Sequence, residues 1–526
     1  MEALLQRGVT TLFGLPGIQT DWLYNALYDA IHVEGADLRV IHTRHEAGAG
    51  YMALGYALAT GGVGVFSVVP GPGFLNAAAA LATAQSLGAK VLCLVGQLPT
   101  DAIGRGRGAL HEVPGQLETL RSLTGWARRA NSPAEIPALM AEAFARLHSG
   151  RPQPAGLELP TNVLAERAQL APADAVPVYR PPLDEEGLEH LATGLASARA
   201  PMLFVGSGAQ GVSAEVTRLA ELLQAPVVAY RTGLGVLDSR HYLSLHQPAG
   251  KKVWPGADAV LAIGSTMRVP LQKWWRTHQP TLLRIDIDPL SHTKFVQPEV
   301  ALTARAEDAL PKLLDRLRAE PPRPSRRAEL EAVKAQWREE VSVLEPQVTY
   351  LRVIREALGE NGIFVDELTQ IGFAARIAFP VYEPRSFLST GYQGTLGWGF
   401  PAALGVKVAR PELPVVSVTG DGGFMFGVQE LATAVQHRIP LVTVLFNNNS
   451  YGNVKQMQQS VYGGRVIASD LYNPDFVALA EAFGALGLRA AGPAKLAKAL
   501  KQGFEHPLPT LIEVPIGEVP SVDRFR

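Results

Sequence analysis

Short apolar runs alternate with longer alanine-rich stretches along the chain. Because the runs are rich in Val, Leu and Ile and are apolar throughout, they predict strands that are buried on both faces. Such strands, separated by helical stretches, form parallel sheets that helices cover on both sides. The pattern therefore predicts an α/β fold. We expect strands at residues 63–69, 91–95, 156–159, 202–205, 227–230, 259–263, 415–418 and 441–446.

Two polar, proline-rich passages interrupt this alternation. The first covers residues 167–184, and the second covers residues 319–327 and continues as a charged helical segment to about residue 341. Since 526 residues are too many for one compact core, we interpret both passages as connectors between domains. The expected domains, each doubly wound around a six-stranded parallel sheet, cover residues 1–165, 180–318 and 345–526.

The composition argues against several classes of function. The net charge of −1 offers no basic surface for a nucleic-acid partner. The single cysteine, Cys93, lies in an apolar run, where we expect a buried thiol, and alone it forms no intrachain disulfide or cysteine metal cluster. Because no uncharged apolar stretch reaches ~18 residues, we expect no membrane-spanning helix. The N-terminal residues lack the apolar core of a signal peptide, which predicts a cytoplasmic location.

Two motifs follow successive predicted strands near the C-terminus. The first reads Thr419-Gly420-Asp421-Gly422-Gly423-Phe424, and the second reads Asn447-Asn448-Asn449-Ser450-Tyr451-Gly452. Neighbouring parallel strands end at the same edge of a sheet, so Asp421 and Asn448 can share one ion. Mg²⁺ prefers such oxygen ligands, and glycines let phosphate approach backbone N–H groups. A turn and a helix cap are the alternative interpretation of these two motifs.

The paired motifs resemble the signature of thiamine-diphosphate enzymes, a Gly-Asp-Gly followed after just under thirty residues by Asn-Asn. Residues 391–405 resemble the matching stretch of acetolactate synthases and related 2-oxo acid decarboxylases. The resemblance implies that the carbonyl of Gly394 accepts from the cofactor's amino group and that Leu396 wedges the cofactor into a bent shape. We expect Leu396 to be largely buried. The resemblance implies cofactor contacts from Gly420, Asp421, Gly422, Gly423, Asn448, Ser450, Tyr451 and Gly452, with Asp421, Asn448 and Ser450 as metal ligands.

A further resemblance begins at Arg44-His45-Glu46, which precedes a run of small residues that predicts a closely packed helix. A carboxylate at the start of a helix is favoured by the helix dipole, and this structural role is one interpretation of Glu46. The segment also resembles the family's Arg-His-Glu-x-Gly-Ala helix, whose glutamate touches the cofactor's pyrimidine ring and activates it. The family places this glutamate and the metal motif in different subunits. The resemblance therefore implies a homodimer or homotetramer with active sites between subunits.

Several positions depart from the acetolactate synthase pattern. Leu110 and His111 stand where those enzymes have a Phe and a Gln that line the substrate pocket. His111 is a candidate general acid–base group, and a surface or structural histidine is the alternative. Met457 replaces a tryptophan that helps to choose the acceptor, which puts acetolactate synthesis in doubt. Leu110, His111 and Met457 are the predicted substrate-pocket residues.

Another departure lies at residues 367–370, which read Glu-Leu-Thr-Gln where the family has Asp-x-Gly-Gln. Gln370 matches the pattern, and we expect it to lie near the diphosphate, whereas Thr369 does not match. In the middle domain, residues 206–211 have the form of a dinucleotide fingerprint, but Arg231 follows the next strand instead of an acid. We therefore expect a tight strand–helix turn there and no bound nucleotide, with FAD as the second possibility.

The leading hypothesis is a thiamine-diphosphate- and Mg²⁺-dependent lyase or carboligase that acts on a small 2-oxo acid. A flavin-assisted oxidase or a carbon–carbon hydrolase on the same scaffold is the second hypothesis. A catalytically silent homologue is the third, although Glu46, Asp421 and Asn448 are all present. A nicotinamide dehydrogenase based on residues 206–211 explains none of the other motifs.

Overall fold

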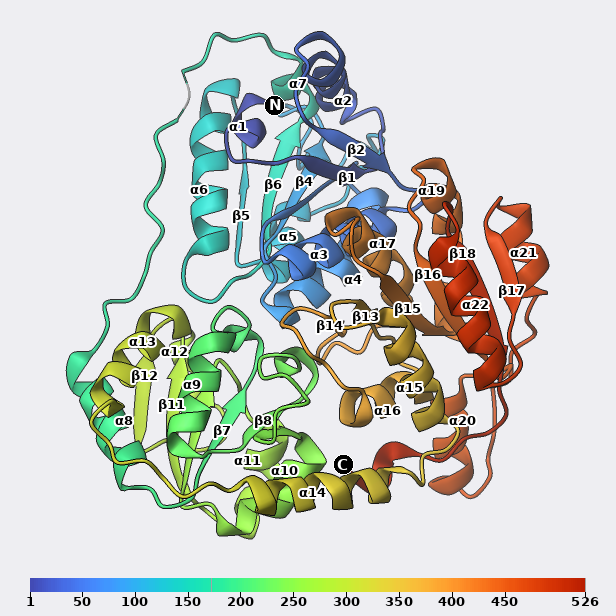
Figure 1. Ribbon diagram of the computed structural model, residues 1–526. Helices are drawn as coiled ribbons and strands as arrows, with labels where there is room; N and C mark the ends of the chain where they lie inside the picture. The colour runs from blue at the N-terminus through green and yellow to red at the C-terminus, as the bar shows by residue number, and fades with distance from the viewer. Residues whose placement is uncertain (172, 526) are drawn as a thin grey trace.

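The computed structural model describes residues 1–171 and 173–525. Its strands form three six-stranded sheets, and every strand pairing within them is parallel. Helices cover the sheets, so the predicted α/β class with three doubly wound units is confirmed. Figure 1 shows the three units in chain order, coloured from blue to cyan, from green to yellow, and from orange to red. None of the described helices is long and apolar enough to cross a membrane.

The first sheet has the strand order β2-β1-β3-β4-β6-β5. Its strands are β1 (Thr11–Gly14), β2 (Arg39–His42), β3 (Gly64–Val68), β4 (Val91–Gln97), β5 (Trp126–Arg129) and β6 (Ala155–Pro160). The helices are α1 (Glu2–Leu5), α2 (Asp21–Tyr28), α3 (Glu46–Thr60), α4 (Pro72–Leu87), α5 (Gln116–Leu123), α6 (Ile136–His148) and α7 (Thr161–Ala165), with short turns η1 (Asp29–Val33) and η2 (Pro133–Glu135). Cys93 is buried in β4, as predicted.

The second sheet has the order β12-β11-β10-β7-β8-β9. Its strands are β7 (Pro201–Val205), β8 (Val227–Ala229), β9 (Ser244–His246), β10 (Ala259–Ile263), β11 (Thr281–Asp286) and β12 (Val300–Thr303). The helices are α8 (Glu185–Ser197), α9 (Ser213–Leu223), α10 (Gln247–Val253), α11 (Arg268–Lys273), α12 (Pro289–His292) and α13 (Ala306–Leu317), with short turns η3 (Ser207–Ala209), η4 (Arg231–Gly233), η5 (Trp254–Gly256) and η6 (Trp274–Arg276).

The third sheet has the order β14-β13-β15-β16-β18-β17. Its strands are β13 (Ile363–Val365), β14 (Phe387–Leu388), β15 (Val415–Gly420), β16 (Val442–Asn447), β17 (Leu486–Arg489) and β18 (Thr510–Pro515). The helices are α15 (Gln347–Leu358), α16 (Gln370–Ala378), α17 (Gly399–Ala409), α18 (Asp421–Phe424), α19 (Glu430–Gln436), α20 (Gly452–Ser460), α21 (Phe476–Ala482) and α22 (Pro493–Glu505), and the turn η7 (Val522–Phe525) ends the described chain.

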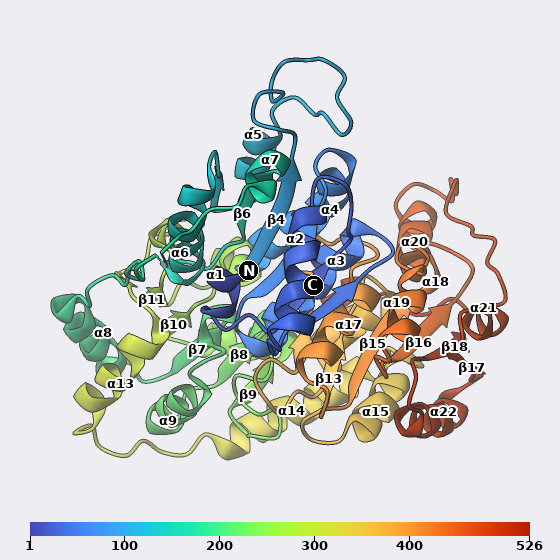
Figure 2. The same ribbon diagram turned by 90° about the horizontal axis from the view of Figure 1, so that it is seen from above.

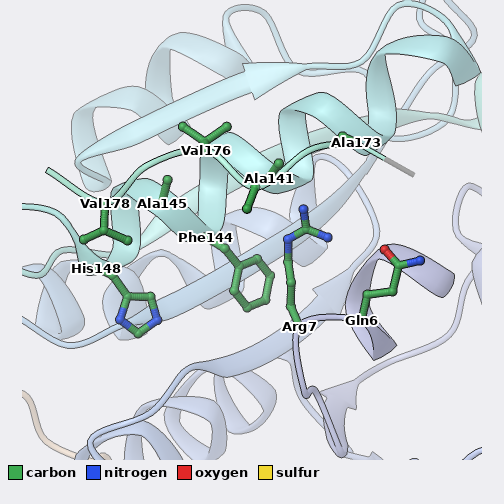
Figure 3. A pocket seen from close by; sticks show the side chains of 10 residues that line it. Gln6, Arg7, Ala141, Phe144, Ala145, His148, Ala173, Val176 and Val178 are labelled. Atoms are coloured by element: carbon green, nitrogen blue, oxygen red, sulfur yellow. The ribbon is translucent and has the colours of Figure 1, made fainter. Parts of the chain in front are cut away.

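The two predicted connectors link these units. The described part of the first has no helix or strand between residues 166 and 184, and residue 172 lies outside the described residues. It passes over α6 and borders an open pocket of about 320 Å³, which Val176 and Val178 line together with Arg7 and Phe144 (Figure 3). The second connector continues as α14 (Arg327–Val341). The limits of the domains between the connectors stay a prediction.

The first and third units share one hydrophobic core, in which α3 packs against α17. Small residues bring the two helices together at backbone distance. A side chain at Gly55 of α3 would collide with the carbonyl oxygen of Ala402, and one at Gly405 of α17 would collide with the carbonyl oxygen of Met52. The small residues after Glu46 therefore serve the contact between two units, and α3 itself is buried on most of its surface.

The glycines of residues 206–211 form a tight turn between β7 and α9, as predicted. The N–H of Gly208 donates to the carbonyl oxygen of Gly264 over 3.2 Å. A side chain at Gly206 would collide with that same oxygen, and one at Gly208 would lie 2.7 Å from the Cα of Gly264. The loops after β7 and β10 thus pack directly on each other at the point where the strand order reverses.

Candidate active site

Asp421 directly follows the carboxyl end of β15 and is buried. The register pairs Gly420 with Phe446, so the chain segments that follow β15 and β16 leave the sheet side by side. The carboxylate of Asp421 accepts from the amide nitrogen of Asn473 over 2.7 Å. Burial raises the pKa of Asp421, while Asn473 and backbone N–H groups, including that of Gly422, oppose the rise. A buried carboxylate of this kind is a strong ligand for a cation.

The two asparagines after β16 differ in how their side chains are used. Asn447 donates to Glu513 over 2.8 Å and accepts from Asn473 over 3.0 Å, so its amide is already committed. Among the described residues, the side chain of Asn448 has no hydrogen-bond partner. Its amide nitrogen lies 2.5 Å from the position that a Cβ on Gly452 would occupy. The predicted ligand Asn448 is therefore the one whose amide is available.

The remaining loop residues form a narrow cradle around these groups. A Cβ on Gly422 would lie 2.6 Å from the ring of Tyr451, and a Cβ on Gly420 would lie 3.2 Å from Thr369. Ser450 pairs with Asp470 in an isolated bridge, which fixes the chain beside Asp421. No group of three or more His, Cys, Asp or Glu side chains arranged for a metal occurs in the described part of the chain. One buried carboxylate with amide oxygens and glycines beside it fits Mg²⁺ held jointly with a diphosphate.

The start of α16 closes one side of this cradle. Thr369, the residue that departs from the family pattern, caps α16 by accepting from the N–H of Gly372 over 2.7 Å. The amide nitrogen of Gln370 lies 3.4 Å from the side-chain oxygen of Gln456 on α20, and its oxygen lies 3.2 Å from the Cβ position of Gly452. Gln370 thus lies beside the loop that carries Asn448. Thr369 has a structural role, because it caps α16.

Gly394 and Leu396 lie in the irregular segment that precedes α17. Gly394 has a φ of +59°, which a residue with a side chain rarely adopts. Leu396 is partly buried in the single chain, next to the exposed residues 392–393, so its full burial stays a prediction.

Glu367 is a fully buried carboxylate that the sequence reasoning did not assign to the site. It accepts from the hydroxyl of Thr419 over 2.7 Å and from the N–H of Gly397, next to Leu396. It also lies 2.9 Å from the Cβ position of Gly423. Burial raises the pKa of Glu367 to about 7, although the hydrogen bonds from Thr419 and Gly397 oppose the rise. Glu367 lies two residues after the buried strand β13, and this position is the sequence signal that could have assigned it to the site.

Asn473 was also missed, although it joins both motifs. It lies in an irregular segment between α20 and α21, where no periodicity indicates which side chain points inward. Its amide nitrogen lies 3.1 Å from the side-chain oxygen of Asn449, in addition to its contacts with Asp421 and Asn447. No pattern in the sequence indicated this role.

Glu46 is the first residue of α3, as predicted. The side chain of the preceding His45 caps the helix by accepting from the N–H of Ala47 over 3.1 Å. The Oε2 atom of Glu46 accepts from Asn76 on α4 over 3.0 Å. Among the described residues, its Oε1 atom has no hydrogen-bond partner. The carboxylate is therefore oriented by Asn76 and keeps one oxygen available.

The substrate-side residues Leu110 and His111 lie in the long loop between β4 and α5, which extends from the body in Figure 2. Leu110 is 60% exposed, so in the single chain it lines no closed pocket. The carbonyl oxygen of His111 lies 2.5 Å from the Cβ position of Gly71, just before α4. Glu46 and His111 thus both lie at the N-terminal end of α4.

Within one chain, Glu46 and His111 of the first unit lie apart from the Gly394–Leu396 segment of the third unit. Thr395, beside Leu396, is 3.2 Å from Thr83 in the second half of α4, whereas Glu46 contacts Asn76 near its start. At about 1.5 Å per residue, these two positions on α4 are roughly 10 Å apart. Met457 borders a different cavity, of about 280 Å³, between α20 and the C-terminal segment. Leu110 and His111 are not among the residues that line it.

Comparison with known proteins identifies this combination of folds and motifs. Three family models match the chain: the N-terminal TPP binding domain of thiamine pyrophosphate enzymes over residues 1–119, their central domain over residues 188–313, and their C-terminal TPP binding domain over residues 368–514. A probable 2-ketoarginine decarboxylase of Pseudomonas aeruginosa is 35% identical, with 98% of this chain and 92% of the relative covered. The chain belongs to the thiamine pyrophosphate enzyme family.

Two further relatives within the thiamine pyrophosphate enzymes are acetolactate synthase large subunits. Isozyme 3 of Escherichia coli is 32% identical over 96% of this chain and 91% of the relative. A probable acetolactate synthase of Methanocaldococcus jannaschii is 32% identical over 98% of this chain and 91% of the relative. The protein is thus a thiamine pyrophosphate (thiamine diphosphate)-dependent enzyme of the decarboxylase and acetolactate synthase type. These relatives do not favour an oxidase, a hydrolase or a silent homologue.

Proposed function

We propose that this enzyme decarboxylates a 2-oxo acid with thiamine diphosphate and Mg²⁺ bound at the carboxyl ends of β15 and β16. The observation that supports it most is that a buried Asp421 and an Asn448 whose amide has no hydrogen-bond partner among the described residues follow neighbouring strands. Asp421, Asn448 and an oxygen of Ser450 would hold the metal. The backbone of Gly420, Gly422, Gly423, Tyr451 and Gly452, with Gln370, would hold the diphosphate.

The protein's own part in the reaction is to orient groups and to move protons. When bound, thiamine diphosphate supplies the electron sink that allows the 2-oxo acid to lose CO₂. The Gly394–Leu396 segment would fix the cofactor's shape, and Glu367 holds that segment through the N–H of Gly397. Glu46 would hold the activating proton on Oε1, since Asn76 occupies Oε2. His111 would act as a general acid–base group toward the substrate.

A homodimer or homotetramer with sites between subunits fits the separation within one chain. Glu46 and His111 lie near the start of α4, and Thr395, next to Leu396, contacts its second half. A partner subunit that presents its third unit to this end of α4 would complete the site. The same partner would cover Leu110, which is 60% exposed, and the half-buried Leu396.

Transfer of the activated aldehyde to an acceptor carbonyl is the second candidate activity. The acetolactate synthase relatives favour it, whereas Met457 in place of a tryptophan does not. The name of the Pseudomonas relative adds a long, basic 2-oxo acid to the substrates worth testing beside pyruvate. The cavity between Met457 and Asp523 has room for a longer side chain.

We propose that the central domain holds no flavin. Gly208 packs closely on Gly264 at the reversal of the strand order, the edge of the sheet at which open α/β sheets bind dinucleotides. A purified protein without flavin absorbance would agree with this proposal, and a yellow protein would contradict it. The cytoplasmic location also stays a proposal.

Calorimetric titration of metal-stripped protein with thiamine diphosphate, with and without Mg²⁺, tests the cofactor site. We expect binding that depends on the metal. Asp421→Ala should weaken the affinity for cofactor about tenfold or more, or about 1.4 kcal/mol, because cation and diphosphate hold each other. Glu481→Ala, on the exposed face of α21, is the matched control and should bind normally.

A CO₂-release assay over a series of 2-oxo acids, including pyruvate and a basic one, then tests the reaction. Release from at least one acid, lost in Asp421→Ala, would support the proposal. Binding without release from any acid would leave the cofactor site intact and reject decarboxylation. Equal affinity of Asp421→Ala and the unchanged enzyme would mean that the metal lies elsewhere.

A further inference from the structure

His111 has a specific partner that neither motif nor resemblance indicated. Its Nδ1 atom lies 2.9 Å from the side-chain oxygen of Gln19, a residue 92 positions earlier in the chain. Gln19 follows β1, and its side chain is only 6% exposed. The contact therefore joins the loop that carries His111 to the interior of the first unit.

The orientation of the Gln19 amide is determined by a second contact. Its nitrogen donates to the carbonyl oxygen of Leu110 over 3.1 Å. A carbonyl oxygen can only accept, so the NH₂ end of the amide must face Leu110 and the oxygen must face His111. That oxygen in turn can only accept, so it requires a proton on Nδ1 of the ring. Neutral His111 is then the tautomer with an unprotonated Nε2.

The backbone of His111 is constrained from the other side. Its φ is +68°, in the left-handed region that a non-glycine residue rarely adopts. Gly71 packs under its carbonyl, and the N–H of Gly71 donates to Gln116 over 2.7 Å. Gln116 donates in turn to the buried Glu158 over 2.9 Å. These contacts hold the backbone of His111 in one conformation.

Glu112, the neighbouring charge, points away from this arrangement. It accepts from the N–H groups of Gly106 and Ala109 and so supports the loop itself. Among the described residues, Nε2 of His111 has no hydrogen-bond partner. The ring thus has one nitrogen held by Gln19 and one available, at the end of α4 where Glu46 also lies.

We infer that Gln19 is a positioning residue, which keeps the proton of neutral His111 on Nδ1 and presents Nε2 as the atom that exchanges a proton with the substrate. Nε2 accepts a proton to give the doubly protonated ring, whose Nδ1–H stays on Gln19. It later returns that proton, and the ring is neutral again. The inference rests on the proposed function, and it assigns to Gln19 a role that acts only through His111.

The first test compares Gln19→Met with His111→Gln. Methionine matches the shape of glutamine and removes both hydrogen bonds. Gln6→Met, at the exposed residue that follows α1, is the control. We expect Gln19→Met to lower kcat/KM about 10–100-fold, with unchanged melting temperature and cofactor affinity. Combined with His111→Gln, it should cause little further loss, because both act through one ring. Independent, multiplicative losses would overturn the inference.

Two more measurements separate positioning from a general structural effect. Gln19→Glu keeps an acceptor for Nδ1–H and should recover part of the activity while moving the His111-dependent limb of the pH profile to higher pH. In protein without cofactor, diethyl pyrocarbonate should modify Nε2 of His111 faster in the unchanged protein than in Gln19→Met. Equal modification rates, or no difference between the Met and Glu variants, would reject the role of Gln19.

The outcome for Gln19 is distinguishable from that of the proposed function. If thiamine diphosphate does not bind, the proposed function fails, whereas the modification rate of His111 still reports on Gln19. If cofactor binding and CO₂ release are found and Gln19→Met behaves like the unchanged enzyme, only the inference about Gln19 fails.

Discussion

Glu46 has one carboxylate oxygen on Asn76 and one without a partner among the described residues. Glu46→Gln keeps the shape and the contact with Asn76 but cannot carry an acidic proton. We expect this variant to bind thiamine diphosphate normally and to lose turnover about 100-fold or more. Calorimetry and a CO₂-release assay on the same preparation measure the two effects. Full turnover would remove Glu46 from the mechanism.

Glu367 makes the stability of the cofactor-free protein depend on pH. Its pKa rises from the ordinary value of 4.5 to about 7 on folding. Between these pH values the unfolded chain has lost a proton that the folded chain keeps, so stability falls as pH rises from about 4.5 through about 7. Glu367→Gln cannot ionise, and its melting temperature should show less of this fall. If the melting temperatures of both proteins changed equally with pH over that range, the result would contradict the assignment.

The contact between α3 and α17 depends on the absence of two side chains. A methyl group at Gly55 or Gly405 would collide with a backbone carbonyl of the other helix. A backbone carbonyl cannot move aside as a flexible side chain can. Gly55→Ala and Gly405→Ala should therefore each destabilise the protein by about 1–3 kcal/mol or more. Thermal unfolding measures this. Gly256→Ala is the control, because a methyl there meets nothing within 4 Å, and equal losses at all three sites would reject the explanation.

Elements with a repeating pattern could be predicted from the sequence, and contacts across loops could not. Buried strands such as β10 (Ala259–Ile263) occur where the apolar run predicted them. Asp421 and Asn448 follow such strands, so their neighbourhood could be inferred from topology alone. Gln19 and Asn473 act through single amide groups in irregular segments, where no periodicity indicates which way a side chain points.

At the scale of the whole molecule, the distribution of the site over two subunits can be tested by mixing two inactive variants. In a mixed oligomer of Glu46→Gln and Asp421→Ala chains, a shared site can receive Glu46 from one chain and Asp421 from the other. Random association should then restore about a quarter of the activity of the unchanged enzyme. Co-expression of the two variants with one tag that both chains carry, followed by the CO₂-release assay, measures this.

Sites contained within single chains would give no restored activity in that mixture, because each chain lacks one required residue. Mixing Glu46→Gln with His111→Gln is a suitable control. Both substitutions lie in the first unit at the same end of α4. In this mixture every chain carries a substitution in its first unit. The mixture should therefore stay inactive in any arrangement of subunits.

The backbone-to-backbone packing of α3 on α17 also limits how the enzyme can move. Two helices in such contact cannot slide or rotate past each other without collisions, so the first and third units of a chain behave as one rigid frame. Opening and closing around a substrate by a hinge between these two units of one chain is therefore not available. Movement that admits a substrate has to come from loops, such as the long one between β4 and α5 that carries His111, or from the boundary between subunits.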